Sequence, residues 1–298
     1  MATSRKVGRV KLSILTPSYG YGRFMSDCVK SVLMQGTVDV EHVVMDGAST
    51  DETVEVLQSL SDDSRLRWFS DPDDGQSDAL NKALAKSSGD WIGWLNVDEF
   101  YLPGTLARVV EHIEQNPSTD VIYGDFAEVD AEGRLQRLVA EHNFSEKALQ
   151  SWSYIPSCAT FIKGEAMAER LWDVQCRSMM DWNLFLDLHT ADKKFVHLRH
   201  PLAAFRVHAD QVTASAAAQS PQEFSLIRAR HGIPMGTSAI RYVKGAGRSA
   251  HIARKVAEGG YLREIRATRA KGRSLRWFDQ VDGQALRLLG LTWPQEVH

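Results

Sequence analysis

The chain has 298 residues, of which 43% are hydrophobic and 24% are charged, enough for one large or two small globular domains with a hydrophobic core. Its formal net charge of -3 argues against a general nucleic-acid-binding protein, so no nucleic-acid partner is expected. No apolar run approaches the roughly 18 residues of a membrane span, and the N-terminal region lacks the hydrophobic stretch of a secretory signal, so we expect a cytoplasmic protein. The cysteines Cys28, Cys158 and Cys176 lack CxxC spacing and are expected to be buried.

Short apolar segments alternate with helical patterns in the first part of the chain. The predicted strands are 9–15, 41–46, 66–71 and 90–98, and the predicted helices are 24–35, 49–60, 76–87 and 104–115. Ser49 or Thr50 is the expected N-cap of the second helix. Repeated strand–helix–strand units predict a largely parallel sheet with helices on both faces, and ligands of such sheets bind beyond the carboxyl ends of the strands.

The pattern changes after Asp120. Two antiparallel strands joined by a turn at Ala131 to Gly133 are predicted, and a strand with a helix, a helix and a last strand follow at 157–171, 179–191 and 202–208. From about Gly232 the composition shifts to Gly, Arg and Lys with short helical pieces. We therefore expect a main domain of residues 1–233 and a basic, mainly helical extension of residues 234–298.

Acidic residues follow three of the predicted strands. Asp46 ends the second strand, and the segment DPDDGQSDALNKAL, residues 71–84, carries four carboxylates after the third. The segment NVDEF, residues 96–100, sets Asp98 beyond the fourth strand, where a carboxylate can bind a hard divalent cation. Each of these acidic residues has a structural alternative as a cap or turn residue, and for Asp71 and Asp73 that alternative is preferred.

These segments resemble the nucleotide-sugar-dependent glycosyltransferases of family 2, whose fold is called GT-A. The resemblance lies in ILTPSYGYGRFMSDCVKSVLMQ, EHVVMDGASTDETVEVL and DPDDGQSDALNKALAKSSGDWIGWLNVDEFYLPGTL, and more loosely in MMDWNLFLDL and FRVHADQVTAS. It covers about residues 11–215. It implies a Rossmann-like α/β fold with a mostly parallel central sheet, helices on both faces, a small antiparallel part on the acceptor side and, in this chain, a C-terminal helical extension.

The resemblance implies a nucleotide site at the strand ends. The turn from Pro17 to Tyr19 resembles the one that packs against the base, and Asp46 resembles the carboxylate that accepts a hydrogen bond from the imide nitrogen, which favours UDP. The segment around Gly75 resembles the one along the nucleoside and diphosphate, supported by Asn81 and Lys82. The implied nucleotide-binding residues are Pro17, Ser18, Tyr19, Asp46, Gly47, Asp74, Gly75, Gln76, Asp78, Asn96 and Val97.

The same resemblance implies a divalent metal, Mn²⁺ or Mg²⁺. Asp98 resembles the metal-binding carboxylate of the Asp-x-Asp motif, and His208 resembles a histidine that approaches the metal or diphosphate in some GT-A enzymes. The chain departs from the motif, because Asn96 stands at its first Asp and Glu99 stands where a second Asp often follows. Asn offers an oxygen ligand without a charge.

Inversion at the anomeric carbon of a sugar requires a base on the acceptor side, because the attacking hydroxyl must lose its proton. Asp181 resembles this base, and its structural alternative is the N-cap of helix 179–191. Asp187 and Glu165 are second choices. Trp182 is expected either to stack on a sugar in the acceptor site or to lie in the core.

The sequence thus predicts an inverting glycosyltransferase that moves a sugar from a nucleoside diphosphate, expected to be UDP, to a hydroxyl group of a glycan or lipid-linked acceptor, in bacterial surface-glycan or polysaccharide biosynthesis. Asn96 and Glu99 leave a non-catalytic sugar-nucleotide-binding protein of the same fold as the alternative. A dinucleotide-binding oxidoreductase is disfavoured, because Met25 stands where its glycine fingerprint needs a third Gly.

The extension is the basic part of the chain. It is expected to hold either an anionic membrane, at the inner membrane surface, or a phosphorylated acceptor, and the alternative is a solvated helical face. Its basic residues are Arg248, Arg254, Lys255, Arg263, Arg266, Arg269, Lys271, Arg273 and Arg276.

Overall fold

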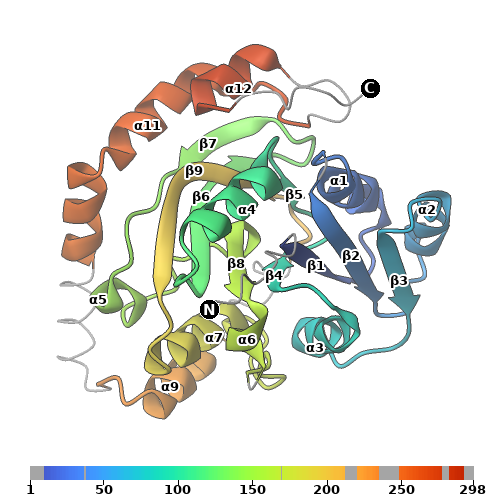
Figure 1. The fold of residues 1–298 in the computed structure, drawn as a ribbon, viewed down its shortest axis with the longest axis horizontal. Coiled ribbons are helices and arrows are strands. Elements are labelled where there is room, and N and C mark those ends of the chain that lie inside the picture. The colour runs from blue at the N-terminus through green and yellow to red at the C-terminus, as the bar shows by residue number, and fades with distance from the viewer. Residues whose placement is uncertain are drawn as a thin grey trace, which may run out of the picture.

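The computed structural model describes residues 10–36, 38–168, 170–211, 220–234, 248–276 and 282–291. In these residues nine strands form one sheet with the order β3-β2-β1-β4-β8-β6-β9-β5, and β7 pairs with β6 (Figure 1). The strands are β1 (Lys11–Ser18), β2 (Asp39–Asp46), β3 (Leu66–Ser70), β4 (Trp91–Trp94), β5 (Phe100–Tyr101), β6 (Val121–Val129), β7 (Leu135–Val139), β8 (Thr160–Lys163) and β9 (Phe195–Arg206). Strands β1 to β4, β6 and β9 run in one direction, and β5, β7 and β8 run against them. The mostly parallel sheet with a smaller antiparallel part is confirmed.

Helices cover both faces of this sheet. They are α1 (Gly22–Leu33), α2 (Thr53–Ser59), α3 (Gln76–Lys86), α4 (Thr105–Gln115), α5 (Glu146–Leu149), α6 (Gly164–Met167), α7 (Met180–Thr190), α9 (Ser220–Arg230), α11 (Gly260–Ala267) and α12 (Gly283–Leu289). Successive side chains of a strand point to opposite faces, so Leu15 of β1 packs with α3, α7 and α9 while Ile14 packs with α1 and α4. Both faces of β1 and β2 are buried, which explains their continuous apolar runs.

Three details differ from the sequence prediction. Strand β4 ends at Trp94 rather than Asp98, and the short strand β5 was not predicted. Helix α2 begins at Thr53, and neither Ser49 nor Thr50 caps it. The carboxylate of Asp51 instead accepts hydrogen bonds from the Thr53 backbone N–H, at 3.2 Å, and from its hydroxyl, at 2.5 Å.

The C-terminal arm, residues 248–276 and 282–291, runs along the outer edge of the molecule beside β7 and β9 (Figure 1). It contains a helix over residues 248–257, then α11, a 3₁₀ turn (Thr268–Ala270) and α12. Apolar side chains such as Leu275 and Leu286 pack with Val129 and Leu138 of the sheet. The predicted domain boundary at residue 233 adjoins residues 235–247, which are outside the described part of the chain, and stays a prediction.

Two further predictions concern the cysteines and membrane-spanning segments. Cys28, Cys158 and Cys176 are free and buried, as predicted. Among the helices that the structure describes, none is long and apolar enough to cross a bilayer.

Candidate functional site

The parallel strands bring three of the predicted binding segments to one edge of the sheet. Ser18 of β1 is paired in register with Asp46 of β2, and Leu15 of β1 with Trp94 of β4, so the turns that follow these strands meet. A cavity of about 790 Å³, here called the donor cavity, opens at this edge. The predicted residues that line it are Pro17, Ser18, Tyr19, Gly47, Asp74, Gly75, Gln76, Asn96, Val97 and Asp98.

Two of the predicted nucleotide-binding residues do not line the donor cavity. Asp78 lies behind the loop that precedes α3, where its carboxylate accepts the backbone N–H of Asp74 at 3.0 Å and pairs with Lys82 Nζ at 2.7 Å. Asp73, predicted to be only a turn residue, accepts the backbone N–H of Gly75 at 2.8 Å and also lines the cavity. Asp78 therefore stabilises the loop in which Asp73 and Asp74 line the cavity.

Asp46 is the other predicted nucleotide-binding residue that does not line the donor cavity, and its side chain has no exposed area. Its carboxylate accepts hydrogen bonds from the backbone N–H of Ser49 at 3.0 Å, from the Ser49 hydroxyl and from the Ser70 hydroxyl at 2.7 Å. The next residue, Gly47, does line the cavity. For Asp46 to accept a bond from a base, the turn around Gly47 and Ser49 must shift.

Arg177 is the feature of this cavity that the sequence prediction missed. Among the described residues it is the one Arg or Lys on the cavity wall, and its guanidinium donates a hydrogen bond to the Asp74 carbonyl. It also covers Gly75, which has a φ of 103° and where a Cβ atom would collide with the guanidinium. Arg177 lies about a hundred residues from the loop it contacts, in a segment without a motif, so the sequence contains no local signal for it.

The predicted metal ligands Asp98 and His208 contact each other, but only Asp98 lines this cavity. The distance from Asp98 Oδ2 to His208 Nε2 is 3.1 Å, and Gln211 Nε2 donates to the same oxygen at 3.4 Å. Arg206 holds the loop by donating to the Asp98 carbonyl at 2.9 Å, while His208 packs edge-on against Tyr21. The fold therefore brings together two residues that are 110 positions apart in the sequence, with Asp98 at the cavity and His208 next to it.

The two departures from the Asp-x-Asp motif have structural roles. The side-chain oxygen of Asn96 accepts hydrogen bonds from Gln76 Nε2 at 2.6 Å and from Trp94 Nε1 at 2.9 Å. Glu99 is buried and accepts the Asn96 backbone N–H at 2.8 Å, and its burial together with the neighbouring Asp98 charge raises the pKa of Glu99 well above its usual value. Both side chains support the loop around Asp98.

The side chains near Asp98 provide only part of the ligands that a hard divalent cation needs. Within the part of the chain that the structure describes, no group of three or more His, Cys, Asp or Glu side chains forms a metal cluster. Asp98 supplies a carboxylate oxygen, the type of ligand that suits Mn²⁺ and Mg²⁺, whereas the imidazole nitrogen of His208 is less suited to these hard cations. The remaining ligands would have to be the oxygens of a bound diphosphate and water.

Asp181, the predicted base, lines a second cavity of about 490 Å³, here called the acceptor cavity. Its half-buried carboxylate accepts hydrogen bonds from the Trp182 backbone N–H at 2.7 Å and from Ser153 Oγ at 3.4 Å. Burial raises the pKa of Asp181 to about 6. Helix α7 begins at Met180 without a side-chain cap, so the alternative that Asp181 is its N-cap is wrong.

The structure also decides between the two expectations for Trp182. Its side chain is 1% exposed, donates a hydrogen bond from Nε1 to the Leu149 carbonyl at 2.6 Å and stacks on Phe224. Trp182 is a core residue, and the expectation that it stacks on a sugar is wrong. Asp187 and Glu165, the second choices for the base, line neither cavity.

The donor and acceptor cavities are neighbours. Phe205 lines both, and Asp181 in the acceptor cavity is close enough to Glu99 in the donor cavity to raise its pKa further. The acceptor cavity also contains Glu141, whose burial raises its pKa to about 8, and the arm contributes His251, whose burial lowers its pKa to about 4. The two cavities therefore adjoin at Phe205.

The sequence has relatives in one large family. Residues 13–167, more than half of the chain, match Glycosyl transferase family 2. An uncharacterized glycosyltransferase (alr2836) of a Nostoc species is 25% identical over 252 residues, which are 78% of this chain and 74% of that protein. A PGL/p-HBAD biosynthesis glycosyltransferase of Mycobacterium bovis is 31% identical over 146 residues, which are 46% of this chain and 57% of that protein.

Solved structures share the fold at lower sequence identity. S. aureus TarS 1-349 in complex with UDP-GlcNAc aligns with a TM-score of 0.64 at 15% identity, over 82% of this chain and 73% of that one. The mannosyltransferase PcManGT from Pyrobaculum calidifontis in complex with GDP-Man and Mn²⁺ aligns with a TM-score of 0.57 at 14% identity, over 86% and 81%. The chain belongs to glycosyl transferase family 2 and is a glycosyltransferase with the GT-A fold.

Proposed function

We propose that this glycosyltransferase transfers a sugar from a UDP-sugar to a hydroxyl acceptor with inversion at the anomeric carbon. One observation carries the proposal. The donor cavity, built from the strand-end turns, adjoins at Phe205 an acceptor cavity that contains the carboxylate of Asp181. Inversion needs the acceptor hydroxyl and its base on the side of the sugar opposite the leaving diphosphate, and two adjoining cavities provide two such sides.

The donor is held by the turns of the donor cavity. Pro17 to Tyr19 would flank the base, with Asp46 accepting from its imide nitrogen once the turn at Gly47 adjusts. The loop before α3 would lie along the diphosphate. Arg177 is placed to offset the charge of that diphosphate, because it is the cation on a wall that otherwise carries Asp73, Asp74 and Asp98.

A bound Mn²⁺ or Mg²⁺ would neutralise the diphosphate oxygens and so favour their departure. Asp98 and His208 are the residues that would hold it. The solved PcManGT structure contains GDP-Man and Mn²⁺, which supports metal use by this fold. Asn96 and Glu99, which raised the alternative of a non-catalytic binder, support the Asp98 loop rather than replace ligands.

Asp181 would act as the general base. As the acceptor oxygen forms its bond to the anomeric carbon, the bond from that carbon to the diphosphate breaks and the hydroxyl proton passes to the Asp181 carboxylate. A carboxylate with a pKa of about 6 is about nine-tenths ionised near pH 7, and it is a stronger base than an ordinary Asp. The raised pKa thus suits the reaction at neutral pH.

The acceptor is proposed to be a glycan or a lipid-linked hydroxyl in bacterial surface-glycan or polysaccharide synthesis. Support comes from what relatives are called: the matched M. bovis protein carries the name PGL/p-HBAD biosynthesis glycosyltransferase. The donor sugar is not part of this proposal, because complexes with UDP-GlcNAc and with GDP-Man, which carry different sugars, occur among proteins of the same fold.

Thermal shift with UDP-, dTDP- and GDP-sugars tests the donor. A ligand at a hundredfold its dissociation constant adds about 2.7 kcal/mol of stability, so the preferred nucleotide should raise the melting temperature most. With the best donor and a glycan acceptor, NMR of the product then reports the anomeric configuration. Stabilisation by GDP-sugars alone contradicts the UDP assignment, and a product that retains the donor's configuration contradicts inversion.

A further inference from the structure

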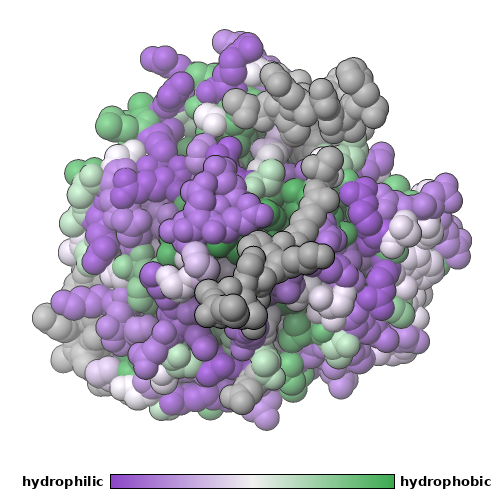
Figure 2. Space-filling view, in the orientation of Figure 1, coloured by the Kyte–Doolittle hydropathy of each residue, from purple (hydrophilic) through white to green (hydrophobic). Residues whose placement is uncertain are grey.

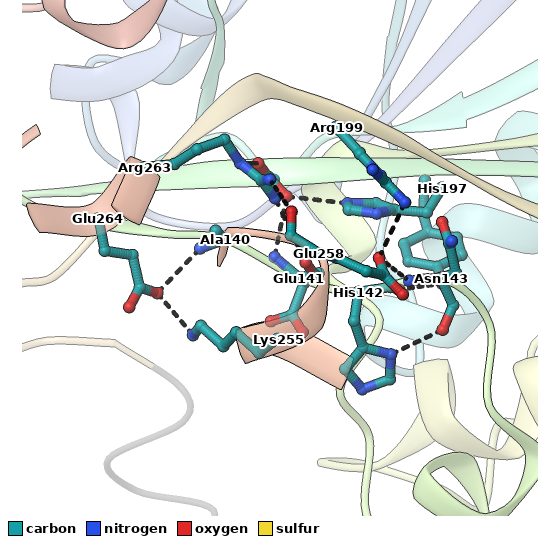
Figure 3. A network of polar contacts seen from close by, with 12 residues as sticks. Ala140, Glu141, His142, Asn143, His197, Arg199, Lys255, Glu258, Arg263 and Glu264 are labelled. Atoms are coloured by element: carbon teal, nitrogen blue, oxygen red, sulfur yellow. Dashed lines mark hydrogen bonds and ion pairs between the residues drawn. The ribbon is translucent and has the colours of Figure 1, made fainter. Parts of the chain in front are cut away.

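The helix over residues 248–257 and helix α11 face the protein with charged side chains, whereas α12 packs on it with apolar ones. In the helix over residues 248–257, Lys255 is buried and pairs with Glu264 of α11 at 2.6 Å. In α11, Arg263 Nε lies 3.1 Å from the buried carboxylate of Asp125, which His197 contacts from the other side at 2.8 Å (Figure 3). These two helices are thus attached to the rest of the protein by polar contacts along their inner face.

Further contacts of the same kind extend this attachment. Glu258, just after the first helix, accepts the backbone N–H of Asn143 at 2.9 Å and pairs with Arg199 at 3.6 Å (Figure 3). Glu264 accepts the backbone N–H of Ala140 at 3.0 Å. A surface helix normally does the reverse and turns its apolar face inward.

The outer face of the same helices is apolar. Five of the ten exposed large hydrophobic side chains in the described residues lie between residues 252 and 265. Leu262 is 72% exposed, Ile265 64%, Val256 62% and Ile252 42%. Ile252 and Val256 are four residues apart and Leu262 and Ile265 three apart, so each pair shares one side of its helix. These four side chains are here called the apolar ridge.

Cations accompany the apolar ridge. Arg254, Arg266 and Arg269 are exposed, and among the described residues none of them has a carboxylate within ion-pair distance. Arg248, Lys271 and Arg287 of the arm are also exposed. Four more basic residues are not available to a partner, because they pair within the protein. These are Lys255 with Glu264, Arg263 with Asp125, Arg273 with Asp282 and Arg276 with Asp27. Arg254, Arg266 and Arg269 therefore place part of the available positive charge beside the ridge.

The position of the helix over residues 248–257 and of α11 suits contact with a partner that has a broad surface. The two helices follow the outer rim of the molecule (Figure 1), and hydrophobic atoms project at that rim beside α11, next to hydrophilic ones (Figure 2). Exposed aliphatic side chains flanked by unpaired arginines are complementary to a bilayer that has anionic headgroups and an apolar interior.

We propose that the apolar ridge and its flanking arginines dock this protein on an anionic lipid bilayer. The inner face of the docked helix contributes His251 and Lys255 to the acceptor cavity, so docking would bring that cavity to the membrane surface. In this respect the inference rests on the proposed function and assigns the acceptor to the lipid-linked class. The docking itself requires no catalytic step.

Flotation of the full chain with vesicles tests the docking. One set of vesicles is phosphatidylcholine with phosphatidylglycerol, and the other is phosphatidylcholine alone. The parent should float with the anionic vesicles, more at low salt than at high salt. The ridge variant, with Ile252, Val256, Leu262 and Ile265 all changed to Ser, should bind at least about tenfold more weakly, because each buried CH₂ group contributes about fourfold to partitioning.

A charge variant separates the two contributions. Arg254→Gln, Arg266→Gln and Arg269→Gln together should reduce binding to anionic vesicles by about a hundredfold, at about fivefold for each cation near the surface. The matched control changes Leu171 and Val174, which are also exposed but lie before α7 and away from the arm, to Ser. This control should bind vesicles like the parent.

The outcomes distinguish the docking from the proposed function. Each variant is first required to keep the parent's melting temperature and its stabilisation by UDP. If the parent does not float with anionic vesicles, or if the ridge variant floats equally well, docking by the ridge is wrong. If light scattering instead shows a parent dimer that the ridge variant loses, without vesicle binding, the ridge is an interface with a second copy. If UDP does not stabilise the parent, this result contradicts the proposed function but not the docking.

Discussion

Replacing Asp181 by Asn tests the assignment of the base with little change in shape. The Asn oxygen can still accept the Trp182 backbone N–H, and the amide can donate to Ser153 Oγ, so both contacts of the carboxylate have a replacement. What is lost is the proton acceptor, which is worth about 10²- to 10⁴-fold in rate. We expect transfer to fall by at least about a hundredfold while UDP binding stays at the parent's value.

The raised pKa of Asp181 also predicts how the stability of this variant, compared with that of the parent, depends on pH. Since the folded-state pKa is about 6 against an ordinary value near 4, folded Asp181 keeps its proton where the unfolded chain loses it. Stability therefore falls as the pH rises from about 4 to about 6, by roughly 3 kcal/mol at most. Asn carries no charge, so Asp181→Asn should be more stable than the parent at about pH 8 and should lose this advantage at about pH 4.

The assays are transfer rate against pH and thermal unfolding at the two pH values. The parent's rate should decline below about pH 6, because the protonated carboxyl cannot accept the hydroxyl proton. Asp187→Asn is the matched control, since Asp187 lies in the same helix and lines neither cavity. Transfer by Asp181→Asn within a few-fold of the parent refutes the assignment, and equal losses in both variants point to a structural effect.

Three further changes test the donor cavity. Asp98→Ala should abolish metal-dependent transfer and weaken nucleotide binding in the presence of Mn²⁺ without unfolding the protein; full activity of the parent in excess EDTA contradicts this. Asp46→Ala should weaken UDP binding by about 1.5–3 kcal/mol in calorimetry, with Ser70→Ala, which removes one contact of that carboxylate, as the control for stability. Arg177→Gln should weaken UDP binding by a similar amount, about 1.5–3 kcal/mol, and more than it weakens uridine binding, since the guanidinium is expected to face the diphosphate. Equal losses for UDP and uridine would show that Arg177 acts only by holding the loop at Gly75.

The sequence by itself determined the parallel half of the fold and the position of the donor cavity. Alternating strands and helices are local patterns, and the carboxyl ends of parallel strands necessarily meet at one edge of a sheet. Hence Pro17, Gly47 and Asp98, which follow three different predicted strands, could be assigned to one site before any contact was known. The hairpin of β6 and β7 was also predictable, because its turn at Gly133 is local.

Only the tertiary structure decided the features that depend on contacts between distant segments. The meeting of Arg177 with the loop at Gly75 and the insertion of β8 between β4 and β6 depend on how whole elements pack. Whether Asp181 has an ordinary pKa or one of about 6 depends on the atoms that surround it. The arm shows the same limit, because its sequence predicts a basic, mainly helical extension. Only contacts with distant groups, such as that of Arg263 with the buried carboxylate of Asp125, turn charged side chains inward and leave Leu262 in solvent.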